Sequence, residues 1–190
     1  WPKVDQVPSQ HTTRRFLGPL RPAPAEPPIS PAPAAAGQGA PMAMFARRAL
    51  SAGEIAIGKE VFGDAIRWAR VRIAQAPPLG FGAMVPLGHT IVFARWRAPA
   101  DFARASLNEQ GWFVHELAHV WQAARGKVLA YSKLSALGAK AYKVKRRAGA
   151  RLRDYNIEAQ AEIARFVFLS RVGAPTPIAR DELERIWATR

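Results

Sequence analysis

The chain contains no cysteine among its 190 residues, which excludes disulfide bonds, cysteine-ligated zinc sites and thiol nucleophiles. It has no apolar run near the roughly 18 residues needed to cross a bilayer and no signal-peptide pattern, so we expect no transmembrane segment. Acidic residues are scarce, at 14 Asp and Glu against 28 Lys and Arg, and the formal net charge is +14. Such an excess favours acidic partners, namely nucleic acid, an anionic envelope surface or an acidic protein.

Proline is abundant in one part of the chain only. Ten of the 16 prolines fall within residues 1–41, in an Ala-rich stretch that favours extended polyproline conformations and cannot build a core by itself. We therefore predict a Pro/Ala-rich tail or linker at residues 1–49 and one folded domain at residues 50–190. The first residue is Trp1 rather than methionine, which suggests a fragment or a processed form.

Hydrophobic residues make up 49% of the chain, and their spacing predicts an α+β domain with a small sheet followed by helices. Capping-box patterns at residues 51–54 (Ser-Ala-Gly-Glu) and 106–109 (Ser-Leu-Asn-Glu) open two helices, which Gly63 and Gly126 close. Asn156 caps a third helix. The predicted elements are helices over residues 51–63, 106–125, 156–171 and from Pro177 onward, strands over 66–74 and 90–93 with a loop at 77–88 between them, and candidate short strands near 128–131 and 141–146.

The strongest chemical signal is the segment Trp-Phe-Val-His-Glu-Leu-Ala-His-Val-Trp-Gln at residues 112–122. His115 and His119 are four residues apart, so on a helix both imidazoles leave one face and can reach one metal ion. Glu116 lies beside the metal, where its carboxylate can deprotonate a water whose pKa zinc lowers to about 7. This is the HExxH arrangement of zinc peptidases, and this composition gives only about 0.004 chance matches. The segment therefore predicts Zn²⁺ with Glu116 as the general base.

A catalytic zinc needs a third protein ligand and leaves its fourth position to water. No third histidine stands at the short metzincin spacing, where the chain has Arg125, and neither His11 nor His89 has a spacing argument. Glu158 and Glu162 lie one turn apart beside an apolar stripe of the next predicted helix. A buried carboxylate needs a partner, which a metal or its histidines would supply. We therefore predict that one of these two glutamates completes the site.

Two assignments of the glutamates stay open. In the gluzincin arrangement the ligand glutamate precedes by four residues an acid that hydrogen-bonds a zinc-bound histidine, which makes Glu158 the ligand and Glu162 the support. The alternative gives Glu162 the metal and Glu158 the support. A zincin also commonly stabilises the oxyanion with a Tyr, His or Arg that reaches the substrate carbonyl. Tyr155 is the first candidate for that role and His89 is the second.

Residues 115–122 (His-Glu-Leu-Ala-His-Val-Trp-Gln) and 155–163 (Tyr-Asn-Ile-Glu-Ala-Gln-Ala-Glu-Ile) resemble a bacterial group of zincin-like, gluzincin-type metallopeptidase domains. That group accompanies polymorphic toxins and Vgr-related secretion proteins. The similarity extends through residues 50–56, 61–66 and 90–93. It implies a zincin-type fold, zinc, and peptide-bond hydrolysis in an effector or maturation role, with secretion or delivery by a bacterial secretion system. The chain departs in one place: Ile157 stands directly before Glu158, where gluzincins commonly have Asn.

A basic segment supports a second interpretation. No acidic residue lies between Glu116 and Asp154, whereas ten Lys and Arg fall there with Tyr131 and Tyr142 interleaved. Such a segment can contact phosphates and stack on bases, although no nucleic-acid motif supports this, or dock an anionic polymer or an acidic inhibitor protein.

The leading hypothesis is a zinc metallopeptidase acting on protein or peptide substrates, with an immunity protein or a secretion-system component as a further partner. The alternative is a basic binding module for nucleic acid or an envelope polymer, with a structural or vestigial metal site.

Overall fold

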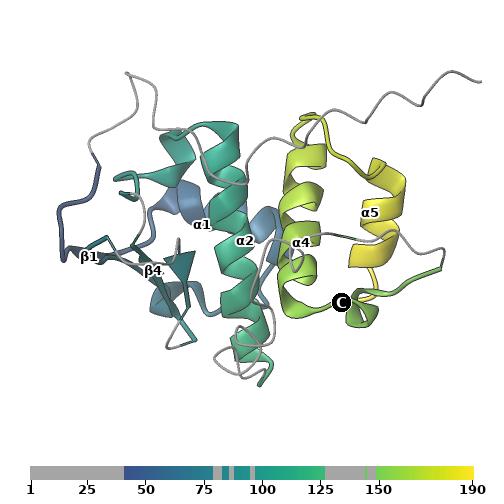
Figure 1. The fold of residues 1–190 in the computed structure, drawn as a ribbon, viewed down its shortest axis with the longest axis horizontal. Helices are drawn as coiled ribbons and strands as arrows, with labels where there is room; N and C mark the ends of the chain where they lie inside the picture. The colour runs from purple at the N-terminus through teal and green to yellow at the C-terminus, as the bar shows by residue number, and fades with distance from the viewer. Residues whose placement is uncertain (1–40, 79–82, 86–87, 95–96, 127–143, 145–148) are drawn as a thin grey trace, which may run out of the picture. The chain divides into compact units, whose positions relative to one another are not determined.

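The computed structural model describes residues 41–78, 83–85, 88–94, 97–126, 144 and 149–190. Within these residues a four-stranded sheet and four α-helices form an α+β arrangement (Figure 1). The predicted fold class is therefore confirmed. None of the described helices is long and apolar enough to span a bilayer.

The sheet has the order β1-β2-β4-β3. β2 (Arg72–Gln75) and β4 (Thr90–Phe93) pair in parallel at its centre, and Ile73 lies opposite Ile91, both fully buried. β1 (Arg47–Ala49) and β3 (Ala83–Met84) add antiparallel at the two edges. The two central strands of this small sheet therefore contribute to the hydrophobic core of the domain.

The helices are α1 (Ala52–Phe62), α2 (Leu107–Ala124), α4 (Ile157–Arg171) and α5 (Arg180–Trp187). Both predicted capping boxes form. The hydroxyl groups of Ser51 and Ser106 each accept a hydrogen bond from the backbone N–H of the glutamate three residues later, and the carboxylate of that glutamate accepts one from the backbone N–H of the serine. Asn156 accepts the N–H of Ala159 at 2.8 Å. Short 3₁₀ turns occupy η1 (Trp68–Arg70), η2 (Phe102–Arg104) and η3 (Leu152–Asp154).

Helix α2 lies at the centre of the packing, with α4 on one side and with α1 and β4 on the other, and α4 also contacts α5 (Figure 1). Phe102 stacks between Phe93 and Phe113, at ring-centroid distances of 5.3 and 4.9 Å, and so joins β4 to α2. The ring of Trp187 lies 5.7 Å from that of Trp121 and ties α5 to α2. These aromatic contacts hold α2 in place, so that its polar face is turned toward α4.

The predicted strand at residues 66–74 is wrong over most of its length, because Trp68–Arg70 form η1 and β2 begins only at Arg72. Trp68 explains the difference. Its indole N–H donates to the carbonyl of Gly63 at 3.0 Å, and its ring lies where a Cβ on Gly58 would come within 2.4 Å. The alternation of apolar and basic residues thus belongs to a turn. The last helix also begins later than predicted, at Arg180 rather than Pro177.

The folded part extends into the segment predicted as tail. β1 lies before residue 50, and Met42 is buried and donates its N–H to the carbonyl of Ala98 at 2.8 Å. β3 falls within the predicted loop. The remainder of the predicted tail, residues 1–40, and the candidate strands near 128–131 and 141–146 (apart from residue 144) lie outside the described residues.

Candidate functional site

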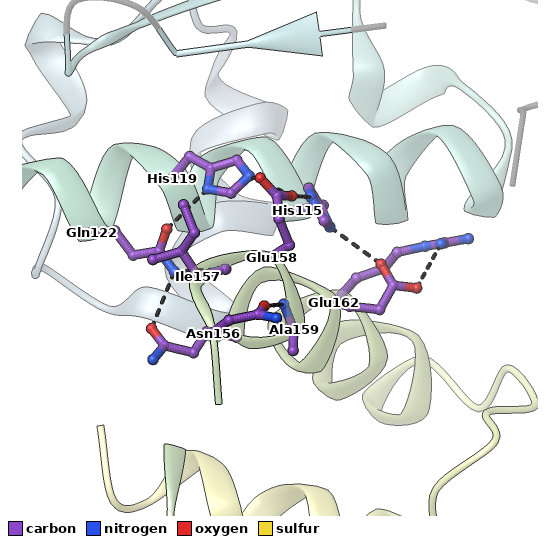
Figure 2. Close-up of polar contacts among 10 residues, drawn as sticks. His115, His119, Gln122, Asn156, Ile157, Glu158, Ala159 and Glu162 are labelled. Atoms are coloured by element: carbon purple, nitrogen blue, oxygen red, sulfur yellow. Dashed lines mark hydrogen bonds and ion pairs between the residues drawn. The ribbon is translucent and has the colours of Figure 1, made fainter. Parts of the chain in front are cut away.

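His115 and His119 project from α2 toward α4, as their four-residue spacing requires (Figure 2). Their exposed fractions are 1% and 0%. The two rings meet edge to face with centroids 5.1 Å apart. Burying two imidazoles side by side is unfavourable unless each ring nitrogen has a partner, so the surroundings of the pair decide what it can do.

Helix α4 supplies carboxylates to both rings. Glu158 reaches between the two histidines, and its Oε2 lies 3.3 Å from the Nε2 of each (Figure 2). Glu162, one turn later, places its Oε2 3.2 Å from the Nδ1 of His115, on the opposite edge of that ring. The structure therefore brings all four predicted metal-site residues together at the α2–α4 interface, with the two glutamates in different positions.

The geometry of His115, His119 and Glu158 fits a divalent metal ion. Their candidate ligand atoms all lie within 4.8 Å of one another. Ligands held at about 2.0–2.1 Å in a tetrahedron lie about 3.3 Å apart, which is the separation of the Glu158 oxygen from each histidine nitrogen. The Nε2 of His119 makes no hydrogen bond among the described residues. It lies close enough to the Oε2 of Glu158 for one, but the angle of the contact is unsuitable. Two imidazoles and a carboxylate are also a usual donor set for zinc.

Glu162 is held by a separate set of contacts. Arg165 donates to its Oε1 at 2.9 Å and also to the side-chain oxygen of Asn108 in α2. The Arg165 guanidinium lies over the ring of Trp112, 4.5 Å from the centroid. One carboxylate oxygen thus faces His115 and the other faces a cation. This arrangement corresponds to Glu158 as the ligand and Glu162 as the support of a histidine, the first of the two predicted assignments; ligation itself stays a prediction.

Gln122 supplies an oxygen to the Nδ1 of His119, as Glu162 does to the Nδ1 of His115, and it was not predicted from the sequence. Its side-chain oxygen lies 2.9 Å from the Nδ1 of His119 (Figure 2). Its amide nitrogen donates to the carbonyl of Ile157 at 2.9 Å and to the side-chain oxygen of Gln160 at 3.2 Å. An oxygen acceptor at Nδ1 favours the tautomer with its proton on Nδ1, which leaves Nε2 unprotonated on the side of Glu158. The available signal was a polar residue three positions after His119 on a helix that is otherwise apolar there.

The charges of the cluster shift the pKa values of its members. Burial alone lowers the pKa of His115, but hydrogen bonds to Glu158 and Glu162 and the charge of Glu116 raise it to about 9. Burial raises the pKa of each α4 glutamate, and their partners outweigh it: the two histidines hold the pKa of Glu158 well below its usual range, and His115 with Arg165 lowers that of Glu162. Without a metal the cluster therefore keeps a proton on His115, which a metal ion would displace.

Glu116, the predicted general base, is 5% exposed. Its Oε2 has no hydrogen-bond partner among the residues that the structure describes. Its carboxylate is nevertheless close enough to His115 for its charge to raise the pKa of that histidine. The side chain therefore lies at the edge of the cluster with one acceptor atom free.

The two oxyanion candidates lie in different surroundings. Tyr155 directly precedes the cap of α4; it is buried, and its hydroxyl group has no hydrogen bond within the described part of the chain. Its backbone carbonyl accepts from the side chain of Gln160 at 2.8 Å. His89 is exposed and lines a cavity beside α2; it does not belong to the group of metal-ligating side chains. The structure thus places Tyr155 next to the start of α4 and separates His89 from His115, His119 and Glu158.

Comparison with known proteins relates this chain to one protein in particular. No family model matches the chain. The type VI secretion system spike protein VgrG2b of Pseudomonas aeruginosa is 38% identical to it in an alignment of 135 residues, and the match covers 66% of this chain and 13% of that protein. The solved effector domain of Pseudomonas aeruginosa VgrG2b is 30% identical, with a TM-score of 0.58, and the match covers 81% of this chain and 87% of that domain. The chain therefore spans most of the effector domain and only a small part of the spike protein.

Proposed function

This chain belongs to the family of the VgrG2b effector domain, and we propose that it is a zinc-dependent hydrolase that cleaves peptide bonds in protein or peptide substrates. In this proposal His115, His119 and Glu158 hold the zinc, and Glu116 is the general base. Because its relative is a spike protein of a type VI secretion system, we also propose that the chain is the effector part of a protein delivered by a bacterial secretion system.

The main support is the unpartnered oxygen of Glu116. The residue follows His115 directly, is 5% exposed, and keeps its Oε2 without a partner among the described residues. A buried carboxylate that lacks partners destabilises a fold, so a purely structural role gives no reason for it. A general base, in contrast, needs a free lone pair for the proton that it accepts. In this proposal Glu116 takes a proton from a water molecule and returns it to the leaving amine nitrogen.

The number of ligands supports a catalytic rather than a structural site. Zinc bound here would lower the pKa of a water ligand to about 7 and polarise a substrate carbonyl. A structural zinc normally has four protein ligands, whereas in the described part of the chain only three side chains offer ligand atoms that all lie within 4.8 Å of one another. This favours the hydrolase over the basic binding module. Tyr155, whose buried hydroxyl group has no partner among the described residues, is our candidate for stabilising the oxyanion.

The test is hydrolysis of casein and of a peptide library by the purified, zinc-loaded chain. We expect Glu116→Gln to lose at least about 10²-fold in turnover and to keep about one zinc per chain, because the substitution removes a base and leaves the three ligands intact. Glu60→Gln, on the exposed side of α1, is the matched control and should keep full activity.

Elemental analysis tests zinc binding independently of hydrolysis. His115→Ala and His119→Ala should each lose most of the bound zinc. Unchanged zinc content in both variants would exclude the metal site. Wild-type turnover in Glu116→Gln would exclude its role as the base.

A further inference from the structure

A cavity of about 480 Å³ opens beside the C-terminal half of α2. Buried apolar side chains form its floor, among them Ile66, Val71 and Val120. Its rim carries two arginines that are exposed, Arg67 and Arg70. The volume lies within the range of about 300–1,000 Å³ that is usual for ligand sites. An apolar floor with charged groups at the rim suits a ligand that has an aliphatic body and a charged end.

The charged side chains that line the cavity within the described residues, Arg67 and Arg70, are both basic. Among the described residues no acidic side chain lines the cavity, and His89 is part of the lining together with the two arginines. Neither arginine side chain makes a hydrogen bond or ion pair with another residue in the described part of the chain. Asp64, the acid nearest to them in sequence, is paired with Lys59 at 3.0 Å. Unpaired guanidinium groups bind carboxylates through paired N–H donors, so the complementary ligand group is a carboxylate.

The cavity is lined by residues from the same face of α2 that carries Glu116. Val120 and Ala123, which both line the cavity, follow Glu116 by four and seven residues and therefore share its face of the helix. At 1.5 Å per residue they lie about 6 and about 10 Å from it along the helix axis. An extended peptide covers about 3.3 Å per residue. A substrate held at Glu116 would thus place a side chain in the cavity after two or three residues.

We propose that this cavity is a subsite for a glutamate or aspartate side chain of the substrate, two or three residues from the bond that is cut. The substrates would then be acidic peptide segments that Arg67 and Arg70 recognise. This inference rests on the proposed function for the cleavage step, but binding of the acidic side chain does not require hydrolysis. Recognition of the acidic side chain and cleavage of the peptide can therefore be tested separately.

The experiment measures binding by fluorescence anisotropy, with the zinc-loaded Glu116→Gln chain as the parent. Two labelled octapeptide mixtures differ only at a central position, which is Glu in one and Gln in the other. We expect the Glu mixture to bind about fivefold to tenfold more tightly, the scale of two partly exposed charge pairs. In Arg67→Gln/Arg70→Gln this ratio should fall to about one. In Arg67→Glu/Arg70→Glu a third mixture with Lys at that position should become the preferred one.

The net charge of +14 attracts any acidic peptide, so a matched charge reversal elsewhere is essential. Arg104 is exposed, lies in η2 and is not part of the cavity lining, and Arg104→Glu should leave the ratio unchanged. A ratio near one in the parent, no measurable binding of either mixture, or an equal loss in Arg104→Glu would each overturn the subsite. A preserved ratio with no cleavage by the wild-type chain would overturn the hydrolase and leave the subsite standing.

Discussion

Two buried carboxylates of this molecule differ in how completely they are paired. Glu54, in the first turn of α1, is fully buried; Arg48 donates two hydrogen bonds of 2.7 Å to it, and the N–H groups of Ser51 and Phe102 add bonds of 2.8 and 2.9 Å. Glu116, in α2, is almost as deeply buried, and its Oε2 has no partner among the described residues. The first carboxylate is saturated and joins three elements of the fold. The second keeps an acceptor available.

Glu158 belongs with Glu116 in this comparison. One of its oxygens is shared between two histidines at 3.3 Å each, and the Nε2 of His119 has no hydrogen bond within the described residues. Buried carboxylates and imidazoles of a stable core are usually satisfied, so the incomplete pairing of Glu116 and His119 indicates a site that an ion or a substrate completes. Burial alone does not separate the two kinds of carboxylate, whereas the list of their partners does.

The largest effect is expected at the proposed metal site. Glu158→Ala removes a proposed ligand and should strip most of the zinc. Glu162→Ala removes no proposed ligand; it removes the contact to the Nδ1 of His115 and the acceptor of Arg165, and losses of that kind weaken affinity by about 10–100-fold. Chelator competition, with the fold checked by circular dichroism, ranks the two variants. If Glu162→Ala proved more damaging, the two roles would be reversed; if neither mattered, the third ligand would lie elsewhere.

Glu54→Ala should have the opposite profile, with stability lost and metal binding kept. Removing the carboxylate leaves the Arg48 guanidinium, whose side chain is 22% exposed, without its partner and also breaks the capping box of α1. We expect the free energy of unfolding in urea to fall by about 3 kcal/mol. Glu60→Ala, on the exposed side of the same helix, should stay within about 0.5 kcal/mol of the wild type. A Glu54→Ala chain of normal stability would contradict the structural role.

Helices and their ends were predictable because their signals are local. The serines and the asparagine that cap α1, α2 and α4 are adjacent to the backbone groups that they satisfy. Strands were less predictable, because their partners are distant. The strand at residues 90–93 was predicted with its observed bounds, whereas β1 pairs with residues more than 20 positions later and follows a Pro-rich segment that gave no sign of it. The Arg48–Glu54 pair depends on that same distant pairing, so it could not be foreseen.

The same distinction applies within the site. Helix geometry alone places His115 and His119 on one face, and one turn separates Glu158 from Glu162 on α4. Which glutamate meets which ring nitrogen depends on how α4 packs across α2, and packing angles cannot be read from either helix separately. For the same reason the sequence could not place His89 or Gln122 relative to the two helices. The first lies at a cavity beside α2, and the second completes the interface between the two helices.

The smallest predicted effect concerns Gln122, which we interpret as a positioning residue for His119. Gln122→Ala removes the acceptor at Nδ1, so the imidazole is free to take the tautomer that carries its proton on Nε2, where the metal would bind. We expect zinc affinity to fall by about tenfold, at the lower end of the range for such contacts because Glu158 and His115 still hold the metal. Chelator competition at constant pH measures the change.

A conservative variant and a neighbour separate positioning from simple loss of packing. Gln122→Glu keeps an oxygen at Nδ1 and should restore most of the zinc affinity, although it loses the amide that donates to Ile157 and Gln160. Gln160→Ala breaks the same interhelical chain one step further from the metal and leaves the contact between Gln122 and His119 intact, so its affinity should stay near that of the wild type. If Gln160→Ala weakened zinc binding as much as Gln122→Ala, the effect would come from the α2–α4 interface as a whole and not from the orientation of His119.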